Sequence, residues 1–427
     1  MLRTIILSPG QPFTAQLLAR RGGLSRAIVD TAAEIVDDVR ARGDEALGEY
    51  TERFDGVRID DIRVGAAEVE HAYTLVDDTL VEALRYAADR IRTFHTQRLQ
   101  ESWTLTDDDG VVLGQKITPI RRVGVYVPGG TAQYPSSVLM NVMPARVAGV
   151  AEIAMVAPPS GEATLSAHTL VAADIAGVSE IYKVGGAQAI GALAYGTATI
   201  PAVDKIVGPG NAFVAAAKKH VMGDVGIDMI AGPSEVLVMA DGSADPRLVA
   251  IDLMAQAEHD VRAATYLITT DASLLAKVEV QLDNLLQRSP RADISRTSLT
   301  ENSLCVICAT TEEAVAVANT IAAEHLEIMM ENAAAVAEGI TCAGALFIGS
   351  WTPESVGDYV AGPNHVLPTG GTARFSSPLS TDDFIKKSSV LSYTRQGLVR
   401  DRRAIETIAL AEGLWAHEHA VIERFSS

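Results

Sequence analysis

The sequence predicts an α/β protein with two parallel-sheet domains, and two observations support this fold class. From residue 117 to residue 348, short runs rich in β-branched side chains alternate with alanine-rich stretches of helical periodicity. Glycine turns such as Gly185-Gly186 and Gly208-Pro209-Gly210 join the runs to the stretches that follow them. Because parallel strands need a crossover connection, usually a helix, this alternation indicates parallel sheets.

The first hundred residues are predicted to be mainly helical. Apolar side chains recur at three- and four-residue spacing over residues 24–43, 44–54 and 66–99, which is typical of helices with one buried face. The segment before them, residues 1–23, has only a short apolar stretch ahead of Pro9 and Gly10.

The strands and helices of the two sheets follow in order. Strands are predicted at residues 123–127, 153–156, 181–184, 205–207, 236–240, 264–269, 304–309 and 344–348. Helices are predicted at residues 187–195, 211–221, 245–260, 272–287 and 312–323. Asp245-Pro246 predicts the start of one helix. An Asp at the N-cap accepts hydrogen bonds from N–H groups of the first turn, and proline is favoured at the first helical position.

The predicted elements divide the chain into four parts. We expect an N-terminal segment (1–23), a discontinuous α/β domain (24–125 with 236–378), a second α/β domain (126–235) and a helical tail (379–427). The polar stretch 370–383 reads as a loop or linker, and residues 400–425 as the helix of the tail.

Composition excludes several classes of protein. Hydrophobic residues make up 48% and charged residues 21%, which is too apolar for a disordered chain. The 35 Lys and Arg against 54 Asp and Glu give a net charge of −19, which disfavours nucleic acid and anionic membranes as partners. No apolar run reaches the roughly 18 residues of a membrane span. These features predict a cytoplasmic protein.

The chain has three cysteines, an odd and small number that is unsuited to a framework of disulfides. This number fits a reducing compartment. Cys305 and Cys308 make a CxxC pair within a predicted strand. Residues three apart on a strand point to opposite faces, so we expect both thiols in the core and not at a shared metal.

The glycine turns are candidates for a nucleotide site. A turn of this kind places backbone N–H groups at a helix N-terminus, where a pyrophosphate is favoured. However, no P-loop is present, and Gly208-Pro209-Gly210 continues with Asn211-Ala212-Phe213 instead of completing GxGxxG. A nucleotide site and plain tight turns both remain open on this evidence.

Gln256 and His259 are candidates for a metal site. Residues three apart on a helix share a face and can reach one ion, and the cluster ends a helix with apolar residues for packing. A solvated helix end explains the pair equally well, and a metal needs further N or O ligands.

Further candidates lie in the last hundred residues. Glu324-His325 pairs an acid with an imidazole that can share proton transfer, although such pairs also occur on ordinary surfaces. Asp358 and His365 lie in an irregular segment rich in Gly, Pro and Asn, the usual setting for functional side chains. The terminal helix carries three more polar candidates, Glu412, His417 and His419.

Eight segments together resemble the histidinol dehydrogenase family over nearly the whole chain. They are GVYVPGG (124–130), VGGAQAIGA (184–192), DKIVGPGN (204–211), IDMIAGPSE (227–235), QAEHD (256–260), EHLE (324–327), GDYVAGPNHVLPTGG (357–371) and EGLWAH (412–417). Each segment alone is weak, but their order and spacing match the family. The resemblance implies two Rossmann-like domains, incomplete because they lack GxGxxG, with small helical N- and C-terminal segments.

The resemblance implies oxidation of L-histidinol to L-histidine by two successive hydride transfers to NAD, through bound L-histidinaldehyde. By resemblance, His325 takes the proton of the substrate hydroxyl and Glu324 activates water. The implied zinc ligands are Gln256, His259, Asp358 and His417. The implied substrate contacts are Ser234, Gln256, His259, His325, Asp358, His365, Glu412 and His417. The implied NAD contacts are Tyr126, Gln188 and Asn211.

The family resemblance also implies an intertwined homodimer. The tail of one subunit, with Glu412 and His417, would complete the site of the other. Two alternatives stay open: a relative that oxidises a different small alcohol or diol with the same zinc and NAD, and a catalytically silent binding protein.

Overall fold

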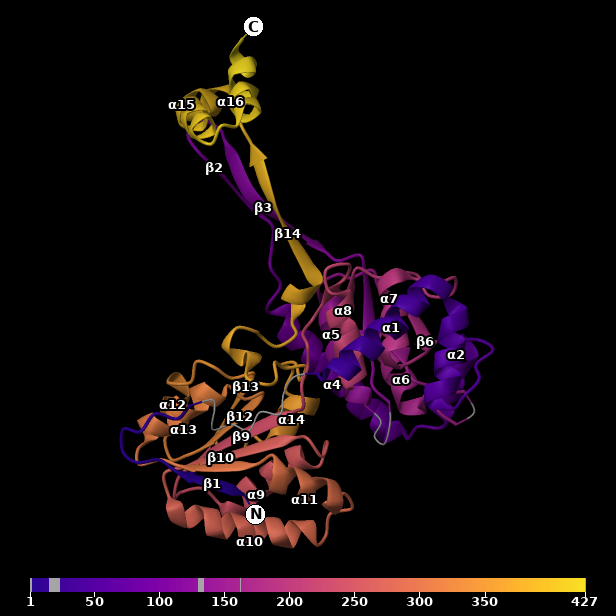
Figure 1. The fold of residues 1–427 in the computed structure, drawn as a ribbon, viewed down its shortest axis with the longest axis vertical. Coiled ribbons are helices and arrows are strands. Elements are labelled where there is room, and N and C mark those ends of the chain that lie inside the picture. Colours follow the sequence, from indigo (N-terminus) through magenta and orange to yellow (C-terminus); the bar gives the residue numbers. More distant parts are fainter. Residues whose placement is uncertain (1, 15–23, 130–133, 162, 427) are drawn as a thin grey trace.

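The computed structural model describes residues 2–14, 24–129, 134–161 and 163–426. These form two α/β lobes and a tail that projects away from both (Figure 1). The α/β class with parallel sheets, predicted from the alternation of strand and helix, is confirmed. Gly130, the last residue of the first predicted glycine turn, lies outside the described residues, as do residues 15–23 of the N-terminal segment.

The first lobe contains a six-stranded parallel sheet in the order β1-β11-β10-β9-β12-β13. Its strands are β1 (Arg3–Ile6), β9 (Glu235–Ala240), β10 (Ala264–Thr269), β11 (Leu304–Ile307), β12 (His325–Met329) and β13 (Ala345–Ile348). Its helices are α9 (Pro246–Ala257), α10 (Ala272–Leu286), α11 (Ala292–Glu301), α12 (Thr311–Ile321), α13 (Ala333–Glu338) and α14 (Glu354–Tyr359). Residues 2–14 therefore belong partly to this sheet, because β1 pairs with β11 at its edge.

The second lobe contains a five-stranded parallel sheet in the order β6-β5-β4-β7-β8. Its strands are β4 (Arg122–Tyr126), β5 (Glu152–Ala157), β6 (Glu180–Lys183), β7 (Lys205–Val207) and β8 (Gly226–Ile227). The helices that follow these strands are α5 (Pro135–Val147), α6 (Ala167–Ala176), α7 (Gly186–Tyr195) and α8 (Ala212–Val221). The strand order reverses between β4 and β7, and in doubly wound sheets a ligand crevice lies at such a point.

The four N-terminal helices pack on the second lobe, which corrects the expected grouping of residues 24–125 with residues 236–378. They are α1 (Arg26–Arg42), α2 (Asp44–Asp55), α3 (Ala66–Thr74) and α4 (Asp78–Thr96). Val36 and Val39 of α1 lie in one apolar cluster with Ile190 and Leu193 of α7, and α4 packs against α5. The helical period revealed which face of each helix is buried, but a buried face does not specify its partner.

The tail is a three-stranded antiparallel sheet that carries two helices. The strands are β2 (Trp103–Thr106), β3 (Val112–Pro119) and β14 (Ile385–Ser392), in the order β14-β3-β2, and the helices are α15 (Arg395–Ala411) and α16 (Trp415–Ile422). The expectation of a helical tail over 379–427 was wrong at β14, whereas the helix expected at 400–425 corresponds to α15 and α16. That strand is exposed along most of its length, so it lacks the alternation of buried and exposed residues that identifies a strand.

The predicted places of the two strand cysteines are confirmed. Cys305 lies in an apolar cluster on one side of the six-stranded sheet and Cys308 in a cluster on the other. Both are buried and free, and burial raises the pKa of their thiols to about 12 and about 11. Among the described helices, none has the length and apolar character required to cross a bilayer.

Candidate active site

Buried polar residues gather at the amino ends of two neighbouring strands of the first lobe. Glu235 begins β9 and His325 begins β12, and these strands pair with His325 opposite Val236. The C-terminal end of α9 brings Gln256 to the same edge. Residues distant in the sequence therefore meet, because both strands lie in the middle of one sheet.

His325 is the centre of this cluster. Its Nδ1 lies 3.2 Å from the backbone carbonyl oxygen of Glu235, 3.7 Å from Oε1 of Glu354 and 3.8 Å from Oε2 of Glu324. Its Nε2 lies 3.7 Å from Oδ1 of Asp358. Burial alone lowers the pKa of the imidazole, but the carboxylates of Glu354 and Glu324 outweigh burial and raise it to about 10.

Glu324 is held beside that imidazole by the backbone. Its Oε2 accepts a hydrogen bond from the N–H of Glu235 at 2.9 Å, and the side chain is buried. Burial raises the pKa of this carboxyl to about 8, although the charge of His325 opposes the rise. A carboxyl that titrates close to neutral pH can both give and take a proton.

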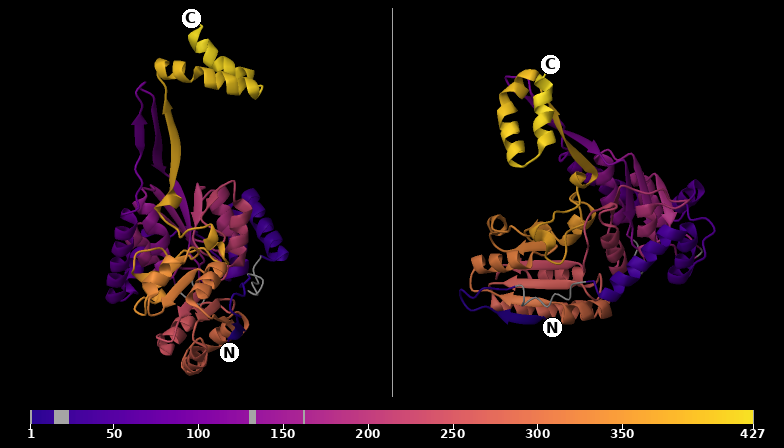
Figure 2. Two further views of the ribbon diagram at one scale, coloured as in Figure 1. Left: turned by 90° about the vertical axis from the view of Figure 1, so that its left-hand side faces the viewer. Right: turned by 45° about the horizontal axis from the view of Figure 1, so that its top comes forward.

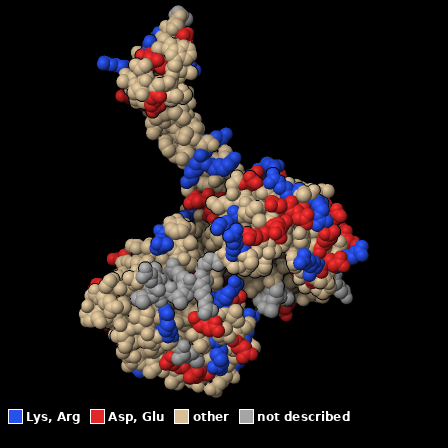
Figure 3. Space-filling view, viewed as in Figure 1, with Lys and Arg blue, Asp and Glu red and all other residues tan. Residues whose placement is uncertain are grey.

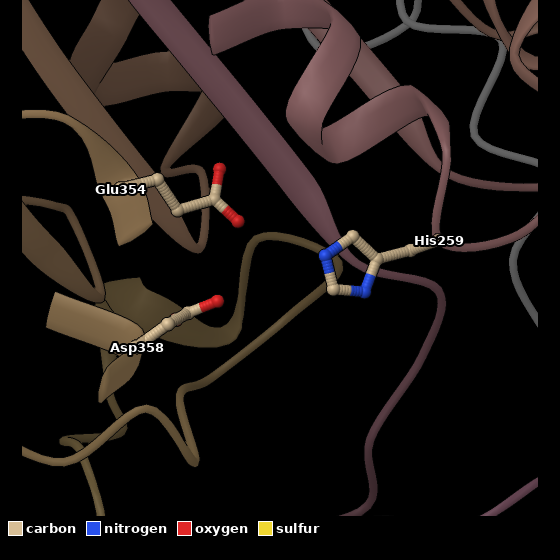
Figure 4. Close-up of side chains that lie close together, drawn as sticks. All are labelled: His259, Glu354 and Asp358. Atoms are coloured by element: carbon tan, nitrogen blue, oxygen red, sulfur yellow. The ribbon is translucent and has the colours of Figure 1, made fainter. Parts of the chain in front are cut away.

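Side chains from the end of α9, from the turn that follows it and from α14 offer oxygen and nitrogen atoms to a metal ion. One atom each of His259, Glu354 and Asp358 lie within 4.8 Å of one another, and the three side chains point toward a common centre (Figure 4). Gln256 is fully buried, and neither polar atom of its amide has a hydrogen-bond partner among the described residues. A buried amide costs free energy unless it is paired, so these residues fit a bound metal.

His365 and Ser234 lie at the border of the same site. Nδ1 of His365 is 3.1 Å from the backbone oxygen of Asp358, and its Nε2 is 3.4 Å from Oγ of Ser137 on α5. His365 therefore connects the cluster to the second lobe. Ser234 directly precedes β9 and its carbonyl accepts a hydrogen bond from the N–H of Ala264, which places it next to Glu235.

Glu412 and His417 are not brought to this cluster within the chain. Glu412 ends α15 and His417 lies in α16, and both side chains are exposed. The tail helices stand away from the first lobe in both views of Figure 2. The structure thus groups two of the four predicted metal ligands, His259 and Asp358, places Gln256 at the end of α9 three residues before His259, and separates His417.

The three predicted cofactor residues line a single cavity of about 990 Å³ in the second lobe. The phenol oxygen of Tyr126, at the end of β4, accepts a hydrogen bond from the N–H of Gly186 at 3.1 Å. Gln188 is 1% exposed, and its amide has no partner among the described residues. Asn211 caps α8 by accepting hydrogen bonds from the N–H groups of its first turn.

This cavity is large enough for a ligand of the size of a dinucleotide. Its size lies at the upper end for ligand pockets, roughly 300–1,000 Å³. It opens at the carboxyl ends of β4 and β5, next to the point where the strand order reverses, as expected for doubly wound sheets. The polar cluster of the first lobe, by contrast, lies at the amino ends of its strands.

Several acidic residues of the cluster escaped the sequence analysis. Glu354 is 3% exposed at the first position of α14, where it resembles an ordinary first-turn acid of a helix. Glu327 accepts a hydrogen bond from the N–H of Glu354 at 2.8 Å, and burial raises its pKa to about 9. In the sequence, Glu327 was marked only by its place in the EHLE segment. Nothing in the sequence indicated that it interacts with Asp252 of α9.

The fold and the site define an α/β enzyme with an acid–imidazole centre in one lobe and a cofactor-sized cavity in the other. The family model described as histidinol dehydrogenase matches residues 18–425. A histidinol dehydrogenase of Geobacter sulfurreducens is 52% identical over 411 residues, covering 95% of each chain. One from Geobacillus kaustophilus is 51% identical over 410 residues, covering 94% of this chain and 97% of the relative.

A solved structure agrees with these relatives. The crystal structure of histidinol dehydrogenase from Elizabethkingia anophelis matches with a TM-score of 0.95 at 39% identity, over 99% of this chain and 98% of that chain. The chain therefore belongs to the histidinol dehydrogenase family.

Proposed function

We propose that this protein oxidises L-histidinol to L-histidine, the last step of histidine biosynthesis, with NAD and zinc. Two successive hydride transfers to NAD would pass through L-histidinaldehyde, which stays bound. The observation that carries the proposal is the buried acid–imidazole pair of Glu324 and His325, with Asp358 3.7 Å from the imidazole, at the edge of the sheet to which α9 brings the buried amide of Gln256. The free cysteines fit a cytoplasmic location.

Zinc would be held by Gln256, His259 and Asp358 of one chain and by His417 of a second. When bound, the ion supplies a positive centre that orients the nitrogen atoms of the substrate. Asp358 is suited to this role because burial, which by itself raises the pKa of its carboxyl, is outweighed by the imidazole of His325 3.7 Å away, so that the pKa is lowered and the group stays ionised.

His325 would take the proton of the substrate hydroxyl as hydride leaves. The role requires a neutral imidazole, whereas the surrounding carboxylates raise its pKa to about 10. Positive charge from a metal ion and the nicotinamide ring lowers the pKa of a nearby imidazole. His325 would therefore become a competent base when the site is loaded, and the carboxylates would stabilise the imidazolium formed by proton transfer.

Glu324 would act in the second half of the reaction. It would take a proton from water as that water adds to the aldehyde, and the hydrate would then be oxidised to the acid. The pKa of about 8 makes its carboxylate a stronger base than an exposed glutamate. The N–H of Glu235 would keep one carboxylate oxygen in place and leave the other available.

NAD would occupy the cavity of the second lobe, where the nicotinamide ring accepts the hydride. Tyr126, Gln188 and Asn211 would contact it, and the buried amide of Gln188, which has no partner in the described part of the chain, would pair with its polar atoms. Tyr126 and Gly186 hold each other through a hydrogen bond, which fixes the turn after β6 against the end of β4.

A homodimer would complete the site through the tail, with Glu412 and His417 supplied by the partner chain. The tail exposes large apolar side chains that a second copy would cover. These are Trp103 (52% exposed), Leu105 (51%), Leu391 (67%), Leu410 (67%) and Trp415 (69%). In the view of Figure 3, the part of the neck next to the tail helices shows almost no charged side chains, and Lys and Arg gather at its lower end.

The decisive experiment is NAD reduction by the purified protein with L-histidinol, with and without a chelator. We expect two NADH for each L-histidinol consumed, and loss of activity after chelation. A single NADH per substrate, or turnover of another small alcohol but not of L-histidinol, would favour the relative with different specificity. Intact NAD and zinc binding without turnover of any alcohol would favour the silent binding protein.

A further inference from the structure

Asp55 is an acidic residue in the dinucleotide cavity that the proposed chemistry does not use. It is the last residue of α2 and lines the cavity together with Tyr126 and Gln188. The chain turns immediately after it, because Gly56 adopts a left-handed conformation with φ 69°. The carboxylate is thereby held at the cavity wall by the end of a helix.

The position of Asp55 is unfavourable for the stability of the fold in three respects. The C-terminal end of a helix carries partial negative charge, which repels a carboxylate. Its Oδ2 atom is buried without a hydrogen-bond partner among the described residues. Burial also raises the pKa of Asp55 to about 6, so that ionisation at neutral pH costs free energy. A residue whose position destabilises the fold in this way, with no packing reason for it, is typically one that binds a ligand.

An aromatic platform lies directly beside Asp55. The rings of Tyr50 and Phe54 stack with centroids 5.7 Å apart and an interplanar angle of 8°, and the guanidinium of Arg53 lies 5.3 Å from the centre of the Phe54 ring. All three line the cavity, and Phe54 is 50% exposed. Planar bases stack on exposed aromatic rings, so this end of the cavity suits the adenosine half of a dinucleotide.

We propose that Asp55 makes the site selective for NAD over NADP by accepting a hydrogen bond from the 2′-hydroxyl of the adenosine ribose. Dinucleotide sites use an acidic residue for this hydroxyl, and the same charge repels the 2′-phosphate of NADP. The inference rests on the proposed use of NAD. Arg53 would favour a phosphate, but its guanidinium lies over the ring of Phe54, 5.3 Å from the ring centre.

The test compares NADH and NADPH binding to the full-length protein by calorimetry, for the wild type, Asp55→Asn and the control Glu34→Gln. Glu34 is an exposed acid that lines the same cavity. Its replacement removes the same charge but leaves the proposed hydrogen bond from the ribose to Asp55 intact. We expect Asp55→Asn to weaken NADH binding about 10-fold and to leave NADPH binding equal or tighter. The Asp55→Asn variant should also have a higher midpoint of thermal unfolding, because the partly buried negative charge at the end of α2 is removed.

The outcomes are separable. A wild type that binds neither nucleotide would contradict the proposed function, whereas a wild type that binds both equally would overturn only the inference. An unchanged ratio of affinities in Asp55→Asn, or an equal change in Glu34→Gln, would also overturn it. A lower unfolding midpoint in Asp55→Asn would show that the carboxylate stabilises the fold through a structural contact. That result would contradict the proposed role of Asp55 in selecting NAD.

Discussion

The Oε1 atom of Glu354 lies 3.7 Å from Nδ1 of His325, and both side chains are almost completely buried. Glu354 is the strongest of the groups that raise the pKa of His325. Glu354 also lies within reach of His259 and Asp358. One carboxylate therefore borders both the proposed proton acceptor and the proposed metal site.

Replacing Glu354 by Gln should lower kcat about 10- to 100-fold, because His325 loses a charge that stabilises its protonated form. The same loss lowers the pKa of His325. The limb of the pH profile on which activity rises with pH should therefore move toward lower pH. The first effect is measured as kcat at saturating L-histidinol, and the second from kcat/KM across the pH range.

The matched control is Glu312→Gln, because Glu312 is an exposed first-turn acid of α12. It should leave kcat and the pH profile unchanged. A Glu354→Gln enzyme with a normal rate and an unmoved limb would show that Glu354 does not act through His325.

Replacing Gln256 by Leu should remove zinc without unfolding the protein. The amide of Gln256 has no partner among the described residues, so an apolar side chain of similar size loses no hydrogen bond there. We expect zinc affinity to fall at least about 10-fold, measured by metal analysis after dialysis, and the metal-free thermal midpoint to stay equal or rise. Gln287→Leu, at an exposed helix end, should keep its zinc.

Mixing two inactive variants tests the exchange of tails. His417→Ala should lack a metal ligand and His325→Ala a base, so each homodimer should be inactive. After unfolding and refolding together, mixed dimers would contain one site with both residues intact, which should restore about a quarter of the wild-type activity. No recovery, with mixed dimers present by mass spectrometry, would place His417 in the site of its own chain or outside any site.

Buried His95 should make stability depend on pH. It is 1% exposed on α4, neither ring nitrogen has a partner among the described residues, and burial lowers its pKa from 6.5 to about 4. The unfolded chain binds a proton more readily, so stability is full above about pH 6.5 and falls as the pH drops toward 4. The loss should be roughly 3 kcal/mol.

Denaturant unfolding at several pH values measures this fall. His95→Phe should lack most of it, because phenylalanine cannot be protonated. His71→Phe, which changes an exposed histidine of α3, should show the wild-type dependence. An identical pH dependence in the wild type and His95→Phe would assign the fall to other groups.

The sequence by itself determined the strands of the two parallel sheets, apart from β1, β8 and β12, several of their helices, and the identity of the family. Alternating strand and helix signals predicted both parallel sheets, since side-chain periodicity reports which face of an element is buried. The eight motifs selected the candidates Glu324, His325, Gln256 and Asp358 before any contact among them was known.

Only the tertiary structure decided which of these residues meet. Glu235 and His325 are 90 residues apart and lie side by side because β9 and β12 are neighbours in the sheet. Helices α1 to α4 joined the second lobe, and Glu354 entered the cluster, through non-local packing. Periodicity records that a face is buried, but the partner of that face depends on the shape and volume of distant elements, which no local pattern encodes.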